Sequence, residues 1–159
     1  MSLHTATIDW SLEAGADFAK GRYSRVHRLS FDGGVTALAS ASPSVVPLPW
    51  SDPAGVDPEE LFVAALSSCH MLTFLDLARR AGFLISRYTD QAEGLMTKND
   101  QGARWVSTVT LRPDIVFDGA APDDAALEAL HDAAHHACFI ANSVRTAVRV
   151  EAALTPQPV

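Results

Sequence analysis

The sequence predicts an α+β protein in which antiparallel sheets pack against a long central buried helix and a second helix. Three observations support this class: alternating, β-branched segments near both ends of the chain, a long uninterrupted helical segment between them, and the absence of regular βαβ alternation. No G-x-G-x-x-G or P-loop motif indicates a nucleotide-binding fold. The length of 159 residues fits a single domain, 1–159.

The N-terminal part is expected to form strands and then a stiff loop. Residues 3–12 and 22–31 carry alternating and β-branched side chains, which favours strands. The glycines of Asp32-Gly33-Gly34 are typical of a hairpin turn, so residues 35–40 are expected to return as the next strand. Prolines recur through residues 41–57 and preclude a regular helix or a central strand, which predicts an extended loop.

The central helix has the clearest start signal in the chain. Asp57 is a good N-cap, Pro58 suits the first helical position, and Glu60 follows the cap by three residues as in a capping box. The run Leu61–Arg80 contains no proline or glycine and is apolar on nearly every side. A helix of this kind is expected to be central and buried.

The C-terminal part is expected to hold strands around one more helix. The predicted elements are strands over 84–96 and 103–117, a turn over 99–102, a helix over Ala125–Cys138, a strand over Thr146–Leu154 and a loose tail over 155–159.

Charge and composition exclude several classes of function. The formal net charge is −7 and the isoelectric point is about 5.2, which argues against a nucleic-acid partner or a membrane surface, since both attract cationic patches. We expect no membrane span, because we expect no apolar run to reach the roughly 20 residues that a bilayer requires. The N-terminus carries no export signal, so a cytoplasmic protein is predicted.

The two cysteines, Cys69 and Cys138, leave three alternatives open. They can be inert buried thiols, a redox pair, or metal ligands together with His70, His135 and His136. The C-H and H-H-x-C spacings differ from the usual zinc patterns, and adjacent helical residues point about 100° apart, so no metal site is predicted. Neither cysteine lies in a C-x-x-C motif.

Three stretches carry a family resemblance. Residues 57–69 read DPEELFVAALSSC, residues 137–144 read ACFIANSV, and Gly33-Gly34 closes an early hairpin upstream of a proline-rich loop. In these motifs and in the order of its elements, the chain resembles the OsmC/Ohr family, named for osmotically inducible protein C and organic hydroperoxide resistance proteins.

The resemblance implies a cysteine-based thiol peroxidase of the oxidative stress response. Cys69 would attack the peroxide and become a sulfenic acid, and Cys138 would condense with it to a disulfide. Glu59 would supply the carboxylate of the motif and hold an arginine beside the thiolate; Arg25 is the first choice and Arg22 the second. The resemblance implies no bound cofactor, because an external dithiol or lipoyl-type compound would reduce the disulfide.

An organic hydroperoxide is the expected substrate, because apolar side chains crowd the helix of Cys69 and a proline-rich loop could roof a pocket. These side chains are Phe62, Leu66, Met71, Leu72 and Phe74, with Pro49-Trp50 from the loop. The alternative is a non-catalytic binding module of the same fold that holds a small lipophilic ligand.

Helix geometry predicts a homodimer with composite active sites. Glu59 and Cys69 are ten residues apart, so in one helix they lie about 15 Å apart along the axis and point about 80° apart. Two antiparallel copies of the helix can bring Glu59 of one chain towards Cys69 of the other. The family resemblance likewise implies an intertwined dimer.

Overall fold

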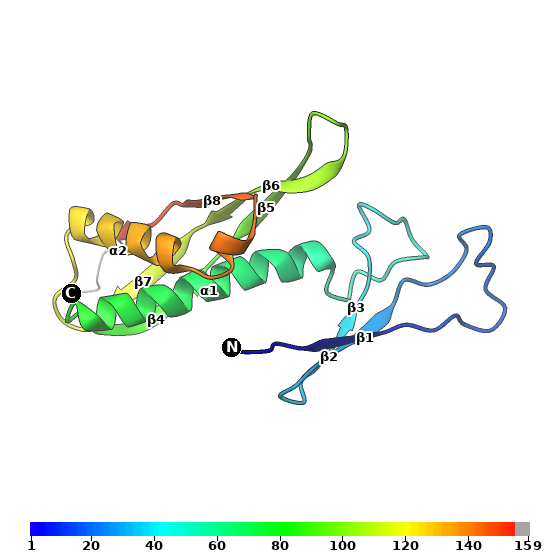
Figure 1. Cartoon of the computed structure of the whole chain (residues 1–159), viewed down its shortest axis with the longest axis horizontal. Coiled ribbons are helices and arrows are strands. Elements are labelled where there is room, and N and C mark those ends of the chain that lie inside the picture. The colour runs from blue at the N-terminus through cyan, green and yellow to red at the C-terminus, as the bar shows by residue number, and fades with distance from the viewer. Residues whose placement is uncertain (155–159) are drawn as a thin grey trace. The chain divides into compact units, whose positions relative to one another are not determined.

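The structure is a computed structural model that describes residues 1–154, and the tail expected over 155–159 lies outside them. The chain divides into two compact units, Met1–Leu61 and a second unit that begins at Phe62 (Figure 1). The prediction of one domain over 1–159 stays a prediction.

The N-terminal unit contains a three-stranded antiparallel sheet. Its strands are β1 (Ala6–Asp9), β2 (His27–Phe31) and β3 (Thr36–Ala39), in the order β1-β2-β3. At the hairpin between β2 and β3, the Gly34 N–H donates to the carbonyl of Phe31 at 3.0 Å. Gly34 has φ +82°, a conformation that glycine adopts without strain. The predicted hairpin is confirmed.

Strand β2 begins at His27, although alternation predicts a strand over 22–31. The backbone N–H of Arg25 donates to the carbonyl of Trp50 at 2.9 Å, so this segment bonds to the proline-rich loop instead of to β1. The loop expected over 41–57 is confirmed. Its end is tied to β3, because the Val56 N–H donates to the carbonyl of Leu38 at 3.1 Å.

Helix α1 (Pro58–Arg80) starts with the predicted capping box. The Asp57 carboxylate accepts from the Glu60 N–H at 2.8 Å, and the Glu60 carboxylate accepts from the Asp57 N–H at 2.9 Å. These reciprocal bonds satisfy two backbone donors that the first turn leaves without partners.

A single chain buries only one stripe of α1. The buried residues follow each other at intervals of four: Leu66, His70, Phe74 and Ala78. Leu72, which points away from this stripe, is 61% exposed. The expectation of a helix buried on all sides therefore holds for one face only within one chain.

By length and composition α1 is also apolar enough to cross a membrane, because it has 23 residues and contains an 18-residue window with a mean hydropathy of 1.6. The expectation that no segment reaches this length is therefore wrong. The signal is weak, because a core helix passes the same test, and Leu66 and Phe74 of α1 pack into two hydrophobic cores. The absence of a membrane partner stays a prediction.

Each of the two long strands expected in the C-terminal unit is divided in two. The observed strands are β4 (Ile85–Asp90), β5 (Glu93–Lys98), β6 (Arg104–Leu111) and β7 (Pro113–Phe117). The Asp90 carboxylate accepts from the backbone N–H of Arg112 at 2.6 Å, and Pro113 has no N–H to donate. The ladder therefore breaks at this point, while the predicted turn over 99–102 joins β5 to β6.

The last predicted strand, over Thr146–Leu154, is also divided in two. Strand β8 (Ala147–Val150) pairs with β6 and β9 (Ala153–Leu154) pairs with β7, and both pairings are parallel. Between them, the Glu151 N–H donates to the carbonyl of Leu111 at 2.8 Å. Two sheets result, ordered β4-β7-β9 and β5-β6-β8. Each contains one antiparallel pair of strands, as expected, and one parallel pair.

Helix α2 (Asp124–Ala137) begins one residue before the predicted start and ends one before the predicted end. Asp123 caps it by accepting from the Ala126 N–H at 2.8 Å. Leu127 and Ala134 of α2 are buried in one core with Phe74 of α1 and residues of β7. A short 3-10 helix, Ala141–Ser143, leads on to β8.

Candidate functional site

The fold of the C-terminal unit brings the two cysteines together. Cys69 lies midway along α1, Cys138 is the C-cap residue of α2, and the two thiols are near enough that Cys69 acts on the pKa of Cys138. Both are free thiols. Adjacent thiols can form one disulfide and so exchange two electrons.

The two thiols differ in burial. Cys138 is 1% exposed, whereas Cys69 is half-buried. Burial, and then the interaction with the neighbouring Cys69 thiol, raise the pKa of Cys138. The N–H of Ala141 donates to Sγ of Cys138 at 3.4 Å and acts in the opposite direction. The accessible thiol is therefore Cys69, and the enclosed one is Cys138.

Glu59 lies in the first turn of α1 and is half-buried. Its neighbour Glu60, not Glu59, makes the capping box. Along α1, Glu59 precedes Cys69 by ten residues, about 15 Å of helix. A role for Glu59 at the thiol stays a prediction.

Arg25 lies in an aromatic cup of the N-terminal unit. Its guanidinium carbon lies 3.7 Å from the centre of the Tyr23 ring, and Tyr23 packs with Trp10 and Phe18. Nη1 donates to the carbonyl of Gly21 at 2.9 Å and also to that of Tyr23. The cup belongs to a pocket of about 470 Å³ with a mostly apolar wall.

Within the described part of the chain, Arg25 forms no ion pair with a carboxylate. The second choice, Arg22, is exposed and its backbone pairs with Asp17. Arg25 is thus the arginine that the local structure orders, and its role at the Cys69 thiolate stays a prediction.

A buried histidine pair is the feature that sequence reasoning missed. Nε2 of His70 and Nδ1 of His131 lie 3.0 Å apart, and the rings are nearly parallel. Burial is the main cause that lowers the pKa of each ring to about 4. The available signal was the position of His70 on the i, i+4 stripe of α1, four residues from both Leu66 and Phe74.

Two further expectations concern the surroundings of Cys69. Leu66 and Phe74, expected to line a substrate pocket, are fully buried core residues instead. In residues 1–154 no group of three or more His, Cys, Asp or Glu side chains is arranged to hold a metal ion.

Comparisons with known proteins agree with this architecture. Residues 51–153 match the family model described as OsmC-like protein. A search of the curated proteins finds no match. An OsmC-like protein of unknown function from Vibrio cholerae is 51% identical, with a TM-score of 0.92 over 96% of this chain and 100% of that one.

Two organic hydroperoxide resistance proteins share the fold at 18% identity. The one from Elizabethkingia anophelis has a TM-score of 0.69 and covers 99% of this chain and 98% of its own. The one from Bacillus subtilis has a TM-score of 0.64, with coverage of 97% and 98%. The matched motif region and the shared arrangement of sheets and helices lead to one conclusion: the chain belongs to the OsmC-like family.

Proposed function

We propose that the protein is a thiol peroxidase that reduces organic hydroperoxides with Cys69 as the attacking thiol and Cys138 as the resolving thiol. One observation carries the proposal: two interacting thiols of unequal burial, one within α1 and one at the end of α2. The organic hydroperoxide resistance proteins of the same fold support the choice of substrate class.

The proposed cycle moves two electrons. The Cys69 thiolate attacks one peroxide oxygen, an S–O bond forms, the O–O bond breaks, and the leaving alkoxide takes up a proton to give an alcohol. The Cys138 sulfur then attacks the sulfenic sulfur, so that an S–S bond forms and the hydroxyl leaves as water with the proton of Cys138. An external dithiol or lipoyl-type compound supplies two electrons and two protons to restore both thiols.

The unequal burial suits these two roles. The half-buried Cys69 is the thiol that a hydroperoxide can reach. Because the pKa of Cys138 is raised, it stays protonated and unreactive until the sulfenic acid has formed next to it. We assign to Arg25 the electrostatic stabilisation of the Cys69 thiolate and to Glu59 the orientation of that guanidinium, and a reducing cytoplasm would provide the dithiol.

We also propose that the active protein is a homodimer. The face of α1 opposite its buried stripe carries exposed small and apolar side chains, among them Ala65 and Leu72. A second copy of α1 packed on this face would remove them from water and place Glu59 of one chain near Cys69 of the other. Sedimentation equilibrium should give twice the chain mass of 17.0 kDa, and an active monomer would contradict the shared site.

Mass spectrometry with cumene hydroperoxide tests the cycle. After one equivalent, the wild type should lose two hydrogen atoms as the disulfide forms. Cys138→Ser should gain one oxygen atom on Cys69, and the matched variant Cys69→Ser should gain none. A folded wild type that neither consumes cumene hydroperoxide with dithiothreitol nor oxidises Cys69 would refute the peroxidase. That result would favour the alternative, a non-catalytic module for a lipophilic ligand.

A further inference from the structure

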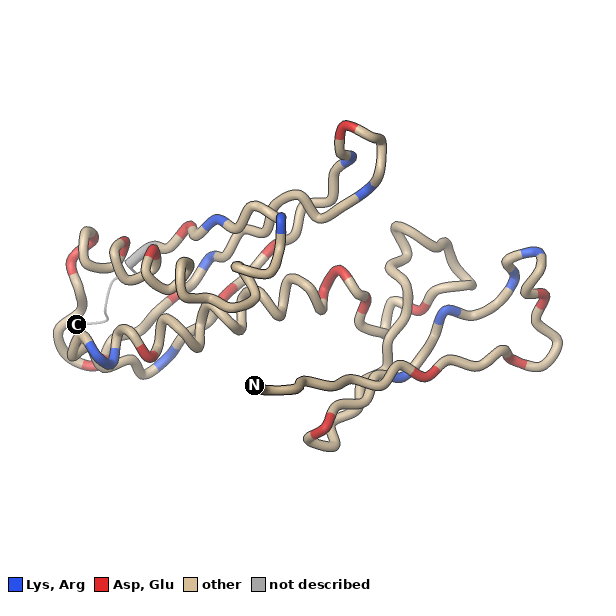
Figure 2. The backbone as a smooth tube through the Cα atoms, in the orientation of Figure 1, with Lys and Arg blue, Asp and Glu red and all other residues tan. Residues whose placement is uncertain are grey.

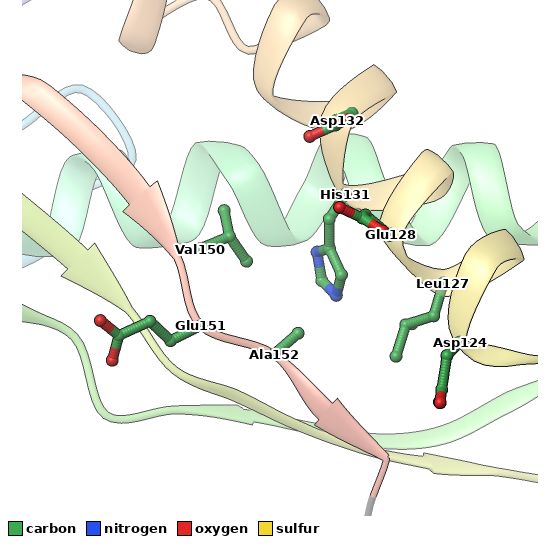
Figure 3. Close-up of a pocket in the computed structure, with 8 residues that line it drawn as sticks. All are labelled: Asp124, Leu127, Glu128, His131, Asp132, Val150, Glu151 and Ala152. Carbon is green, nitrogen blue, oxygen red and sulfur yellow. The ribbon is translucent and has the colours of Figure 1, made fainter.

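A cavity in the C-terminal unit has features that the thiol chemistry does not use. It lies between α2 and the segment that follows β8, and its volume is about 590 Å³ (Figure 3). Small-molecule sites in proteins span roughly 300–1,000 Å³. Leu127, Val150 and Ala152 provide its apolar wall.

Three carboxylates border this cavity along one face of α2. Asp124, Glu128 and Asp132 follow each other at intervals of four residues, so they lie in a row. Helix α2 contains no Lys or Arg, and Figure 2 shows only acidic colour along it. In the described part of the chain none of the three forms an ion pair. Like charges at this spacing repel, and a bound cation would relieve the repulsion.

A fourth carboxylate at the cavity, Glu151, is already paired. Its oxygen accepts from Nε of Arg112 at 3.0 Å, on a side chain that is more than half exposed. The negative potential of the cavity therefore comes from the row on α2.

The second and independent observation is a buried polar atom at the same cavity. His131 lines the cavity and is only 4% exposed, and Figure 3 shows its ring extending from α2 towards Val150 and Ala152. Nδ1 of His131 is engaged with His70, whereas Nε2 has no hydrogen-bond partner. A buried polar atom without a partner is costly, which favours a ligand that supplies one.

The hydrogen bond between the two imidazoles allows Nε2 of His131 to act as an acceptor. When Nδ1 of His131 carries the hydrogen, it donates to His70 and leaves Nε2 as an acceptor. The ring is uncharged at neutral pH, because burial and then His70 lower its pKa to about 4. A neutral acceptor beneath a row of carboxylates matches a group that is both a hydrogen-bond donor and a cation.

We propose that this cavity binds a small organic cation, namely a primary ammonium group on an apolar body. One ammonium N–H donates to Nε2 of His131, the charge faces the row Asp124, Glu128 and Asp132, and the apolar body packs on Leu127 and Val150. A bare metal ion fits less well, since no group of three ligating side chains among residues 1–154 is arranged to hold one. The site is separate from the thiol chemistry proposed above.

Calorimetry on the full chain at pH 7 tests the site with three probes of similar size: benzylamine, benzyl alcohol and benzoate. We expect benzylamine to bind at least tenfold more tightly than benzyl alcohol, and benzoate not to bind. Glu128→Gln/Asp132→Asn should weaken the binding of benzylamine about fivefold or more, because it removes two of the charges that attract the ammonium group. The effect is moderate because both charges are exposed and act through solvent. The control Glu13→Gln/Asp100→Asn removes the same charge from exposed sites elsewhere and should leave the affinity unchanged.

The nitrogen NMR chemical shifts of the imidazoles provide a second measurement, which binding through apolar contacts alone would leave unchanged. Benzylamine should change the chemical shift of Nε2 of His131, because this atom then accepts a hydrogen bond. It should also hold the hydrogen of the ring on Nδ1, with a matching change in the chemical shifts of His70. Equal affinity for benzylamine and benzyl alcohol, no binding of benzylamine, or displacement of benzylamine by Mg²⁺ alone would each overturn the proposal.

Discussion

Acidification from pH 7 to pH 4 should destabilise the protein, chiefly because His70 and His131 gain protons in the unfolded chain but stay neutral while they are buried in the folded one. Each ring has a pKa of about 4 in the folded chain, against 6.5 for a solvated histidine. Between these values the unfolded chain binds up to two more protons than the folded one, so the free energy of unfolding falls as the pH falls. Above pH 6.5 this contribution is constant.

The size of the effect follows from the two pKa values. One pH unit corresponds to about 1.4 kcal/mol per proton, so each ring contributes about 3 kcal/mol between pH 6.5 and pH 4. After burial, His70 further lowers the pKa of His131. For His70, burial is followed by His135, which lowers the pKa, and by Asp90, which raises it. We expect a total loss between about 3 and 6 kcal/mol, a large share of the 5–15 kcal/mol typical of a domain.

Urea denaturation followed by circular dichroism at several pH values measures this loss, at one protein concentration throughout. The double variant His70→Leu/His131→Leu removes both imidazoles and replaces them with apolar groups of similar size. Between pH 4 and 6.5 its free energy of unfolding should change less steeply with pH than that of the wild type. The difference in slope should correspond to up to two bound protons. His136→Gln, an exposed histidine of the same helix, is the control and should keep the wild-type slope. A double variant with the wild-type slope would refute the neutral buried pair.

Three further predictions concern the fold. Phe74→Ala should lower the free energy of unfolding by about 3–5 kcal/mol in urea titrations, because Phe74 is fully buried between α1 and α2. Asp90→Ala should cost about 1–3 kcal/mol and accelerate hydrogen exchange at the Arg112 amide, since the carboxylate accepts from that N–H and from Ser67; an unchanged exchange rate would contradict the strand-break argument. Asp123→Ala should cost about 1 kcal/mol by removing the N-cap of α2, a loss that Asp123→Asn should largely spare.

Local signals in the sequence were sufficient to predict the helices and turns. Capping residues and unbroken apolar periodicity located α1 and α2 to within about one residue, because the backbone groups at a helix end must find nearby partners. The two glycine-containing turns were equally local. The motif at residues 57–69 was sufficient for the family, which the match over residues 51–153 confirms.

Only the tertiary structure decided where the long strands break and what the buried groups contact. The break at Asp90 depends on a hydrogen bond to Arg112, 22 residues away, and the pairing of His70 with His131 spans 61 residues. The contact between Cys69 and Cys138 likewise joins two helices that are far apart in the sequence. Helical spacing determines which face of its own helix a side chain occupies, but the partner on the opposing face is chosen by how the helices and sheets pack, and no local pattern encodes that choice.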